Sequence, residues 1–334
     1  MKFIIEKLLD QQSMTQEEAR TIMLKIMSGE YDDAQISGFL IALRAKGEIS
    51  EEIAGFAQAM RDKMTKIESV NDAIDMCGTG GDSSGTFNIS TTAAFVVASA
   101  GVPVAKHGNR SMTSKSGSAD VLTALGVDIT LPPEKVSQCI HDIGIGFMFA
   151  PSLHPAMKYA MGARVALGTR TVFNILGPLC NPAGVQRQLM GIFDGTLTEK
   201  IAQVLQKLGS VHAMIVHGDD GLDELSTTAS TKISRLKNDG SIDNMSISAS
   251  DFGINRASLE DLKGGSPEKN AEITKAILNG SNTGPKADIV ILNAAAGIFV
   301  GGKSESIAEG VNIARDVINS GSAMDTLQKL IVVK

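Results

Sequence analysis

The sequence lacks several of the features that mark particular protein classes. Its 334 residues include no tryptophan and only three cysteines, Cys77, Cys139 and Cys180. These widely spaced cysteines form no C-x-x-C pair, which argues against the common zinc and redox motifs and predicts reduced thiols. No apolar run approaches the roughly 18 residues that a membrane helix needs, and charges interrupt the N-terminal MKFIIEKLLDQQ, unlike the apolar core of a signal peptide. We therefore expect a cytoplasmic protein without a membrane partner.

Positive charge is also scarce. Lys and Arg number 31 against 37 Asp and Glu, which gives a net charge of −6. A protein built to grip nucleic acid phosphates needs a basic surface, so no nucleic acid partner is expected. A small anionic substrate in a local pocket is still compatible with this charge. Hydrophobic residues make up 43% of the chain, as in globular proteins, and the length predicts about two domains of roughly 100–200 residues.

The first 66 residues follow helical patterns. Thr15 and Glu18 form a T-x-x-E capping box ahead of apolar residues at helical spacing. A second helix is predicted over residues 33–46, and Ser50 is predicted to cap a third whose first turn is acidic. Three short amphipathic helices bury little surface alone. They must pack on the rest of the chain, on a second subunit, or on both.

From residue 70 onward, apolar segments with strand character alternate with helical ones. This alternation predicts an α/β domain with a mainly parallel central sheet and helices on both of its faces. Two extended runs around Asn238-Asp239-Gly240 interrupt the rhythm and predict an antiparallel hairpin. The predicted fold is therefore a small helical N-terminal domain followed by a larger α/β domain. The segments read as strands are DAIDMC, VPVAK, IGFMFA, LMGIFD, HAMIVHG and ADIVILNAA.

A glycine-rich stretch, CGTGGDSSGTFNIST (residues 77–91), follows the first predicted strand. Strand ends that turn toward a helix are the usual ligand sites of open α/β sheets. Gly78, Gly80 and Gly81 would let backbone N–H groups face an anion, and the N-terminus of the next helix would add its own N–H groups. The alternative is a tight turn with Ser90 as a plain helix cap. The stretch matches neither G-x-x-x-x-G-K-[ST] nor G-x-G-x-x-G, so it supports neither a P-loop nor a dinucleotide site.

A second polar loop, KHGNRSMTSKSGSAD (residues 106–120), leaves the next predicted strand at the same sheet edge. Two donor-rich loops on adjacent strands favour a site for two phosphates or a diphosphate over a merely solvated loop. The donors of this loop are Lys106, His107, Asn109, Arg110, Ser111, Thr113, Ser114, Lys115 and Ser118.

An acidic loop, HGDDGLDELS, follows the predicted strand HAMIVHG. Asp223 and Glu224, or the nearby Asp219 and Asp220, offer hard oxygen ligands. Mg²⁺ shared with a substrate diphosphate needs only one or two protein carboxylates. Opposite two phosphate-binding loops, a magnesium site is a better interpretation than a solvated turn.

These motifs together resemble the anthranilate phosphoribosyltransferases. GTGGD, TFNIST, KHGNR, SGSAD, FNILGPLCNPA and DELS are all present, and the likeness covers essentially the whole chain. The resemblance implies transfer of the phosphoribosyl group of 5-phosphoribosyl 1-diphosphate (PRPP) to the amine of anthranilate with release of diphosphate, the second step of tryptophan synthesis from chorismate. It also implies a nucleoside phosphorylase/phosphoribosyltransferase-like fold, Mg²⁺ as cofactor, and a homodimer joined through the helical domain.

The resemblance further implies how the chain is divided. It assigns residues 1–66 to the helical domain, joined by a helical segment around 163–184, and residues 70–334 to the α/β domain. Hinge segments are expected near 67–72 and 174–184.

The resemblance also assigns roles to individual residues. It implies no acid or base catalyst; Lys106 and Mg²⁺ would support the transition state. Val165 and Ala166 depart from the family pattern, which often has charged residues there, and Ser83 replaces a common glycine. The PRPP residues are Gly78, Gly81, Asp82, Thr86, Asn88, Ser90, Thr91, Lys106, Ser114 and Ser118. The anthranilate residues are Gly78, His107, Asn109 and Arg164, and the metal ligands are Ser90, Asp223 and Glu224.

Three other functions fit parts of the pattern. A pyrimidine nucleoside phosphorylase shares the helical-plus-α/β plan, but its lysine-histidine loop continues with serine and a glycine pair, whereas His107 here leads into Gly108-Asn109-Arg110. A non-enzymatic paralogue that binds nucleic acid would predict a basic surface and lost site residues. The helical N-terminus could also make the chain an interaction subunit, as in relatives that associate with a glutamine amidotransferase.

Overall fold

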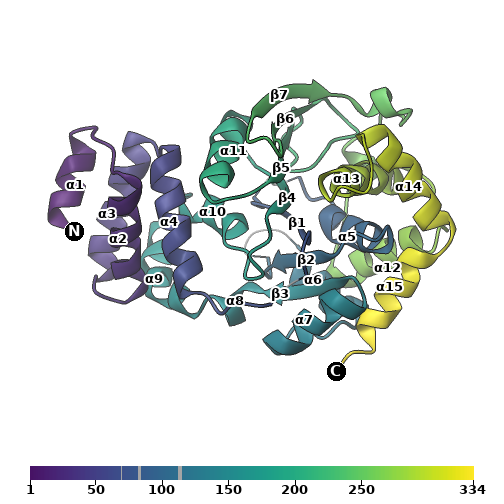
Figure 1. The fold of residues 1–334 in the computed structure, drawn as a ribbon, viewed down its shortest axis with the longest axis horizontal. Coiled ribbons are helices and arrows are strands. Elements are labelled where there is room, and N and C mark those ends of the chain that lie inside the picture. Colours follow the sequence, from purple (N-terminus) through teal and green to yellow (C-terminus); the bar gives the residue numbers. More distant parts are fainter. Residues whose placement is uncertain (69, 82–83, 112–114) are drawn as a thin grey trace.

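The computed structural model describes residues 1–68, 70–81, 84–111 and 115–334. Figure 1 shows a group of helices that carries the N-terminus at one end and a sheet covered by helices at the other, with the C-terminus far from the N-terminus. The predicted plan, a small helical part followed by a larger α/β part, is confirmed.

Local signals in the sequence set the N-terminal helices. The predicted capping box is present: the backbone N–H of Glu18 donates to Thr15 Oγ1 at 3.2 Å, and that of Thr15 donates to Glu18 Oε2 at 2.7 Å. The prediction for Ser50 was wrong, because Ile49 is the capping residue and Ser50 lies inside the helix. A further helix at the N-terminus was not predicted. The bounds are α1 Lys2–Leu9, α2 Gln16–Met27, α3 Asp33–Lys46 and α4 Ser50–Lys63.

A buried carboxylate holds the ends of these helices together. Glu52 on α4 is fully buried, and its oxygens accept hydrogen bonds from the backbone N–H groups of Met14 and Ile49. The Lys46 ammonium at the end of α3 lies 2.9 Å from Glu52 Oε2 and is itself almost fully buried. A buried charge persists only when it is paired and hydrogen-bonded. Glu52 therefore fixes how α3 and α4 meet the start of α2.

Within the described residues, the strands form a seven-stranded sheet in the order β3-β2-β1-β4-β5-β6-β7. The pairs from β3 to β5 are parallel, and β6 and β7 form the predicted antiparallel hairpin at one edge. Since β1 and β2 are parallel neighbours, the loops that follow them leave the same edge of the sheet. The bounds are β1 Ile74–Gly78, β2 Val104–Gly108, β3 Ile145–Phe149, β4 Arg187–Gly191, β5 His212–Gly218, β6 Thr231–Leu236 and β7 Ile242–Ile247.

Helices cover both faces of the sheet (Figure 1). The segment at 287–295 was predicted as a strand and is instead the middle of helix α13, Pro285–Val300. Its residues are buried almost all round, and a short run of buried apolar residues has no period that separates strand from helix. None of the helices in the described residues has the length and apolar character to cross a membrane.

The remaining helices follow the strands in the chain. α5 lies between β1 and β2, α6 and α7 between β2 and β3, and α11 between β4 and β5. Their bounds are α5 Ile89–Ser99, α6 Ser118–Leu125, α7 Pro133–Asp142, α8 Ala150–Leu153, α9 Lys158–Leu167, α10 Phe173–Leu176, α11 Thr198–Lys207, α12 Pro267–Leu278, α14 Ile307–Asn319 and α15 Ser322–Ile331.

The buried side chains divide between the two faces of the sheet. One cluster joins α5 and α12–α15 to the face that carries Ile74, Met76 and Val104. Another runs from α2–α4 through α9 and α10 to α11 and to Met190 and Ile215 on the opposite face. Because this second cluster is continuous, the domain boundary expected near residues 66–70 stays a prediction.

Candidate active site

The glycine loop meets the acidic loop at the end of the sheet. The backbone N–H of Gly80 donates to Asp223 Oδ2 at 2.8 Å, and the N–H of Ser90, in the first turn of α5, donates to Glu224 Oε1 at 3.1 Å. Turn amides and helix N-termini are favourable positions for negative charge. Here the protein's own carboxylates hold these donors, so the loop and the helix start both bind oxyanions.

Two glycines of the loop leave room for charged side chains. A Cβ on Gly78 would overlap the carboxylate of Asp223. Gly81 has φ +79°, and a Cβ there would lie 3.3 Å from Nη2 of Arg170. A side chain at Gly81 would therefore be strained by its backbone conformation as well as crowded. In this structure the carboxylate of Asp223 lies close to Gly78 and the guanidinium of Arg170 lies close to Gly81.

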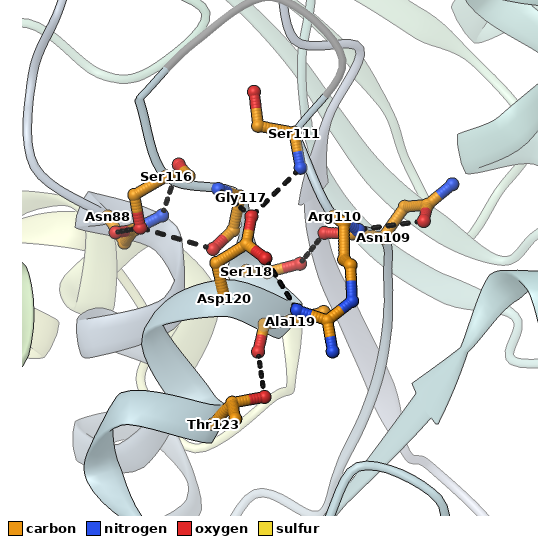
Figure 2. Close-up of polar contacts among 10 residues, drawn as sticks. All are labelled: Asn88, Asn109, Arg110, Ser111, Ser116, Gly117, Ser118, Ala119, Asp120 and Thr123. Atoms are coloured by element: carbon orange, nitrogen blue, oxygen red, sulfur yellow. Dashed lines mark hydrogen bonds and ion pairs between the residues drawn. The ribbon is translucent and has the colours of Figure 1, made fainter. Parts of the chain in front are cut away.

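The second loop is tied to the first through Asn88, the residue that precedes α5. Asn88 Nδ2 donates to the carbonyl of Ser116 at 3.1 Å, and Asn88 Oδ1 accepts from Ser116 Oγ at 3.1 Å and from Asn270 Nδ2 at 3.0 Å. Figure 2 shows Asn88 and Ser116 facing each other beside the start of α6. The prediction that the two loops share one edge is confirmed, and the Asn88 amide fixes their separation.

Within the second loop, Asp120 organises the backbone (Figure 2). Its Oδ2 accepts from the N–H groups of Ser111 at 3.0 Å and Gly117 at 2.9 Å, and its Oδ1 accepts from Arg110 Nη1 at 2.8 Å. Ser118 Oγ donates to the carbonyl of Asn109 at 3.3 Å. Both ends of the loop are thereby held at the N-terminus of α6.

Lys106 lies on β2 and is only 3% exposed. Its Nζ donates to the carbonyl of Met76 on the neighbouring strand at 2.5 Å. Burial lowers the pKa of the Lys106 ammonium, while the charges of Asp75 and Glu224 oppose that shift. An ammonium is thus kept at low exposure beside the acidic loop, where a further anion would stabilise it.

His107 faces a different environment from Lys106. Its Nε2 lies 3.2 Å from Nε2 of His154, and its backbone N–H donates to Asp75 Oδ1 at 3.1 Å. Burial, and second the neighbouring His154, lower the pKa of His107 to about 3, and burial lowers that of His154 to about 4. Both imidazoles are therefore neutral at physiological pH and can donate or accept hydrogen bonds without charge.

The carboxylates of the acidic loop have two different roles: one stabilises the loop itself, and another contacts the glycine loop. Asp220 accepts from Ser226 Oγ at 2.6 Å, from Thr228 Oγ1 and from the N–H of Leu222, which shapes the loop. Asp223 reaches the glycine loop. Of the alternatives open from the sequence, the geometry favours Asp223 and Glu224 over Asp220 as ligands for a bound group.

Arg164 lies on α9, with its Cζ 5.3 Å from the centre of the Phe173 ring. Burial lowers the pKa of its guanidinium from the ordinary value, which still leaves it positively charged. Phe173 begins α10, and the segment that follows reaches Gly177, whose backbone hydrogen-bonds the His107 ring. Arg164 and the histidine pair therefore meet the same segment from opposite ends.

Comparison with known proteins identifies the family of the chain. Residues 70–324 match the a/b domain of a glycosyl transferase family, and residues 2–64 match the helical bundle domain of the same family. An anthranilate phosphoribosyltransferase of Alkaliphilus metalliredigens (strain QYMF) is 52% identical over 333 residues, 99% of this chain and 97% of the relative. The chain belongs to the anthranilate phosphoribosyltransferase family.

Solved structures of the family superpose on nearly the whole chain. The anthranilate phosphoribosyltransferase of Thermus thermophilus matches with a TM-score of 0.92 at 41% identity, covering 98% of each chain. The enzyme of Saccharomyces cerevisiae in complex with PRPP and Mg matches with a TM-score of 0.90 at 29% identity, covering 98% of this chain and 95% of that one.

The structure brings together six of the residues that the resemblance to this family singled out. Gly78, Gly81, Asn88, Ser90, Asp223 and Glu224 lie around the contact between the glycine and acidic loops. Thr86 forms an isolated bridge with Lys263, and Thr91 is buried in α5. Asp82 and Ser114, together with Ser83, lie outside the described residues.

Sequence reasoning missed several residues that shape the site of this family member. His154 follows β3, the next strand at the same edge, and that position was the available signal. Asp75 is a fully buried carboxylate inside a predicted strand, and its Oδ2 accepts from Asn181 Nδ2 at 2.7 Å. Arg170 is brought to Gly81 from a distant segment. Nothing local to the sequence marks that contact.

The neutral histidines predict a pH dependence of stability. Their folded-state pKa values lie below the ordinary 6.5, so between pH 6.5 and about 4 the unfolded chain binds more protons and the free energy of unfolding falls on acidification. Each histidine contributes up to about 1.4 kcal/mol per pH unit in this window. Urea unfolding of His154→Gln should show a smaller loss between pH 7 and 4.5 than the original chain. His141→Gln, which removes a 74% exposed side chain, is the control; equal slopes for all three proteins would contradict the assignment.

Proposed function

We propose that this chain transfers, in the cytoplasm, the phosphoribosyl group of PRPP to the amine of anthranilate, giving N-(5-phosphoribosyl)anthranilate and diphosphate for tryptophan synthesis. One observation carries the proposal: the amides of Gly80 and Ser90 already bind carboxylate oxygens where two donor-rich loops meet. A substrate with a 5-phosphate and a diphosphate suits donors arranged in this way. Buried thiols at Cys77, Cys139 and Cys180 are consistent with a reducing compartment.

The PRPP side is formed by the two loops after β1 and β2. Backbone amides of the glycine loop and the start of α5 would hold phosphate oxygens, together with Ser118 at the start of α6. Asn88 keeps the loops at a fixed spacing through Ser116 and Asn270. Lys106 would pair with the departing diphosphate, since its buried ammonium gains most from a close anion.

The donor set near the acidic loop suits Mg²⁺. Ser90 Oγ and the carboxylates of Asp223 and Glu224 are hard oxygen ligands, and Mg²⁺ takes one or two protein carboxylates with substrate phosphates and water. In the yeast relative, PRPP and Mg occur in one complex. When bound, the ion would neutralise charge that develops on the diphosphate. The backbone N–H groups of Gly80 and Ser90, which here donate to Asp223 and Glu224, would then donate to phosphate oxygens of the substrate.

The anthranilate side is proposed to lie toward Arg164 and His107, with Asn109 and Gly78 near the reacting centre. The Arg164 guanidinium suits the anthranilate carboxylate because its planar fork can make two parallel hydrogen bonds. The neutral His107–His154 pair adds polar contacts without repelling an aromatic amine. An aromatic amine is already unprotonated at neutral pH, so no base is required to activate it.

Catalysis on these residues would consist of positioning and electrostatic stabilisation. Lys106 and the loop amides stabilise the leaving diphosphate as the anomeric carbon acquires oxocarbenium character, and the amine attacks from the opposite face with inversion. The helical and α/β parts would close on the substrates to exclude water. Of the expected hinges, the 174–184 segment is fixed at two points on the sheet side: Gln188 Nε2 donates to the Pro178 carbonyl at 2.7 Å, and Asn181 Nδ2 donates to Asp75. If this segment bends when the two parts close, the backbone of the residues before Pro178 would change conformation.

The function is tested by the decay of anthranilate fluorescence on mixing with PRPP and Mg²⁺, which the absence of tryptophan makes easy to follow. The original chain should consume anthranilate and release diphosphate only when PRPP and Mg²⁺ are both present. The double variant Asp223→Asn, Glu224→Gln should lose at least about 100-fold in turnover, as expected when a charge-stabilising group is removed. The variant Asp219→Asn, at a carboxylate in the same loop, is the control.

A folded protein that binds PRPP but consumes no anthranilate would refute the acceptor assignment, and phosphorolysis of thymidine or uridine would identify a nucleoside phosphorylase.

The variant Arg164→Ala should weaken the binding of anthranilate and leave the binding of PRPP nearly unchanged. Loss of a bidentate charged contact of about 1.5–3 kcal/mol should raise the KM for anthranilate roughly 10- to 100-fold and leave PRPP binding within about twofold. The KM of Arg164→Lys for anthranilate should lie between those of the original chain and of Arg164→Ala. A lysine keeps the positive charge but cannot make two parallel hydrogen bonds to a carboxylate. Steady-state kinetics with each substrate varied in turn give the two values. Equal losses for both substrates would show that Arg164 supports the fold instead.

The helical part is proposed to join two copies of the chain. Helices α1, α3 and α9 each carry exposed apolar side chains. α3 packs against both of the others, and the three helices lie at the end of the molecule that carries the N-terminus (Figure 1). Exposed apolar side chains on helices packed together in this way favour an interface between subunits. These side chains are Phe3, Leu9, Ile41, Tyr159, Met161 and Val165.

The subunit interface is tested by light scattering of Ile41→Lys. Ile41 is 42% exposed on α3, and a lysine within an apolar interface should convert a dimer to monomers. Leu259→Lys replaces an apolar side chain of similar exposure, 40%, in the α/β part and should leave the dimer intact. A monomeric mass for the original chain at micromolar concentration would rule the proposal out.

A further inference from the structure

Arg170 lies in the connector between α9 and α10, yet its guanidinium rests on the glycine loop. Its Nη2 donates to the carbonyl of Gly81 at 2.5 Å, and its Cζ lies 4.1 Å from the centre of the Phe193 ring. A guanidinium stacked on an aromatic ring loses little freedom when it forms a hydrogen bond. Arg170 is therefore held in place on the side of Gly81 that faces the connector.

The backbone at the same place in the connector is bonded to helix α3 of the helical part. Arg44 on α3 donates through Nη1 to the carbonyl of Arg170 at 2.6 Å and to Thr169 Oγ1 at 2.5 Å. Arg44 and Arg170 thus form a relay, here called the arginine relay: α3 fixes the backbone of residue 170, and the side chain of residue 170 fixes the carbonyl of Gly81.

Two further contacts of the described part of the glycine loop come from the α/β part. Gly80 is held by Asp223, and the N–H of Phe193 donates to Thr79 Oγ1 at 3.1 Å. Phe193 thereby supports the loop directly and also provides the ring on which Arg170 stacks. The arginine relay adds a contact from the other side, so the position of Gly81 depends on where the helical part lies.

We propose that Arg170 is a positioning residue for the PRPP loop and that, through Arg44, it makes the conformation of this loop depend on the placement of the helical part. The inference rests on the proposed function, which assigns PRPP to this loop. Arg164 and Arg170 stand on either side of Gly168, the residue that ends α9. The end of α9 and the connector that follows it therefore carry the arginine assigned to anthranilate and the arginine that holds the PRPP loop, so the two proposed substrate sites adjoin one short stretch of the chain.

The test is the affinity for PRPP with Mg²⁺, measured by titration calorimetry, together with the KM of each substrate. Arg170→Ala should weaken PRPP binding about 10-fold, as expected for the loss of a charge-assisted hydrogen bond, and should change the KM for anthranilate by less than about twofold. Arg170→Lys, which keeps a donor and loses the planar stack, should recover part of the loss. Arg235→Ala is the matched control, because Arg235 also stacks on an aromatic ring, that of Phe299 at 4.4 Å, away from the loop.

The relay is tested by a double-mutant cycle with Arg44→Ala. If Arg44 acts through Arg170, Arg44→Ala should weaken PRPP binding in the original chain and have no further effect when residue 170 is alanine. Additive effects would overturn the relay, and unchanged PRPP affinity in Arg170→Ala would overturn the positioning role. Failure of the original chain to bind PRPP would instead count against the proposed function. Thermal unfolding of each variant separates loss of binding from loss of fold.

Discussion

The site depends on one contact between segments far apart in the chain: the carboxylates of Asp223 and Glu224 on the amides of Gly80 and Ser90. The sheet order makes this contact possible, because β4 lies between β1 and β5 and the acidic loop must pass over its end to reach the glycine loop. β4 ends in Gly191, where a Cβ would collide with the backbone carbonyl of Asp223. The acidic loop is held in shape from within by its own hydrogen bonds, which leaves these two carboxylates to face the glycine loop.

The same contact sets the charge balance around Lys106. Its ammonium has little exposure, and the charges of Asp75 and Glu224 favour the protonated form against the cost of burial. If Mg²⁺ and a diphosphate bind together, the carboxylates of Asp223 and Glu224 would hold the cation, and the amides of Gly80 and Ser90, with Lys106, would hold phosphate oxygens. Each of these groups would then have a hydrogen-bond partner or an opposite charge both before and after the substrate binds.

Local and regular features of this chain could be predicted from sequence, and long-range contacts could not. The capping box at Thr15 and the hairpin around Asp239 depend on residues close in sequence, and both are present. The loops after β1 and β2 could be placed together because parallel strands end at one edge. The run at 287–295 was misread because a helix buried almost all round shows no amphipathic period. The contact of Arg170 with Gly81 depends on how distant segments pack, and no spacing in the sequence encodes that.

Two successive residues of β2 separate the two halves of the proposed chemistry. Because successive side chains of a strand point to opposite faces of the sheet, Lys106 lies toward the acidic loop and His107 lies toward His154. The phosphate-binding groups would therefore occupy one side of the end of β2 and the groups assigned to anthranilate the other, so the reacting atoms would meet where the strand ends at Gly108. Gly108 has no room for a side chain, because a Cβ would overlap Ser118 Oγ at the start of α6. A larger residue there would press on the second loop and on the proposed meeting point together. The short strand β2 would then set both the separation of the proposed substrate sites and the place where they meet.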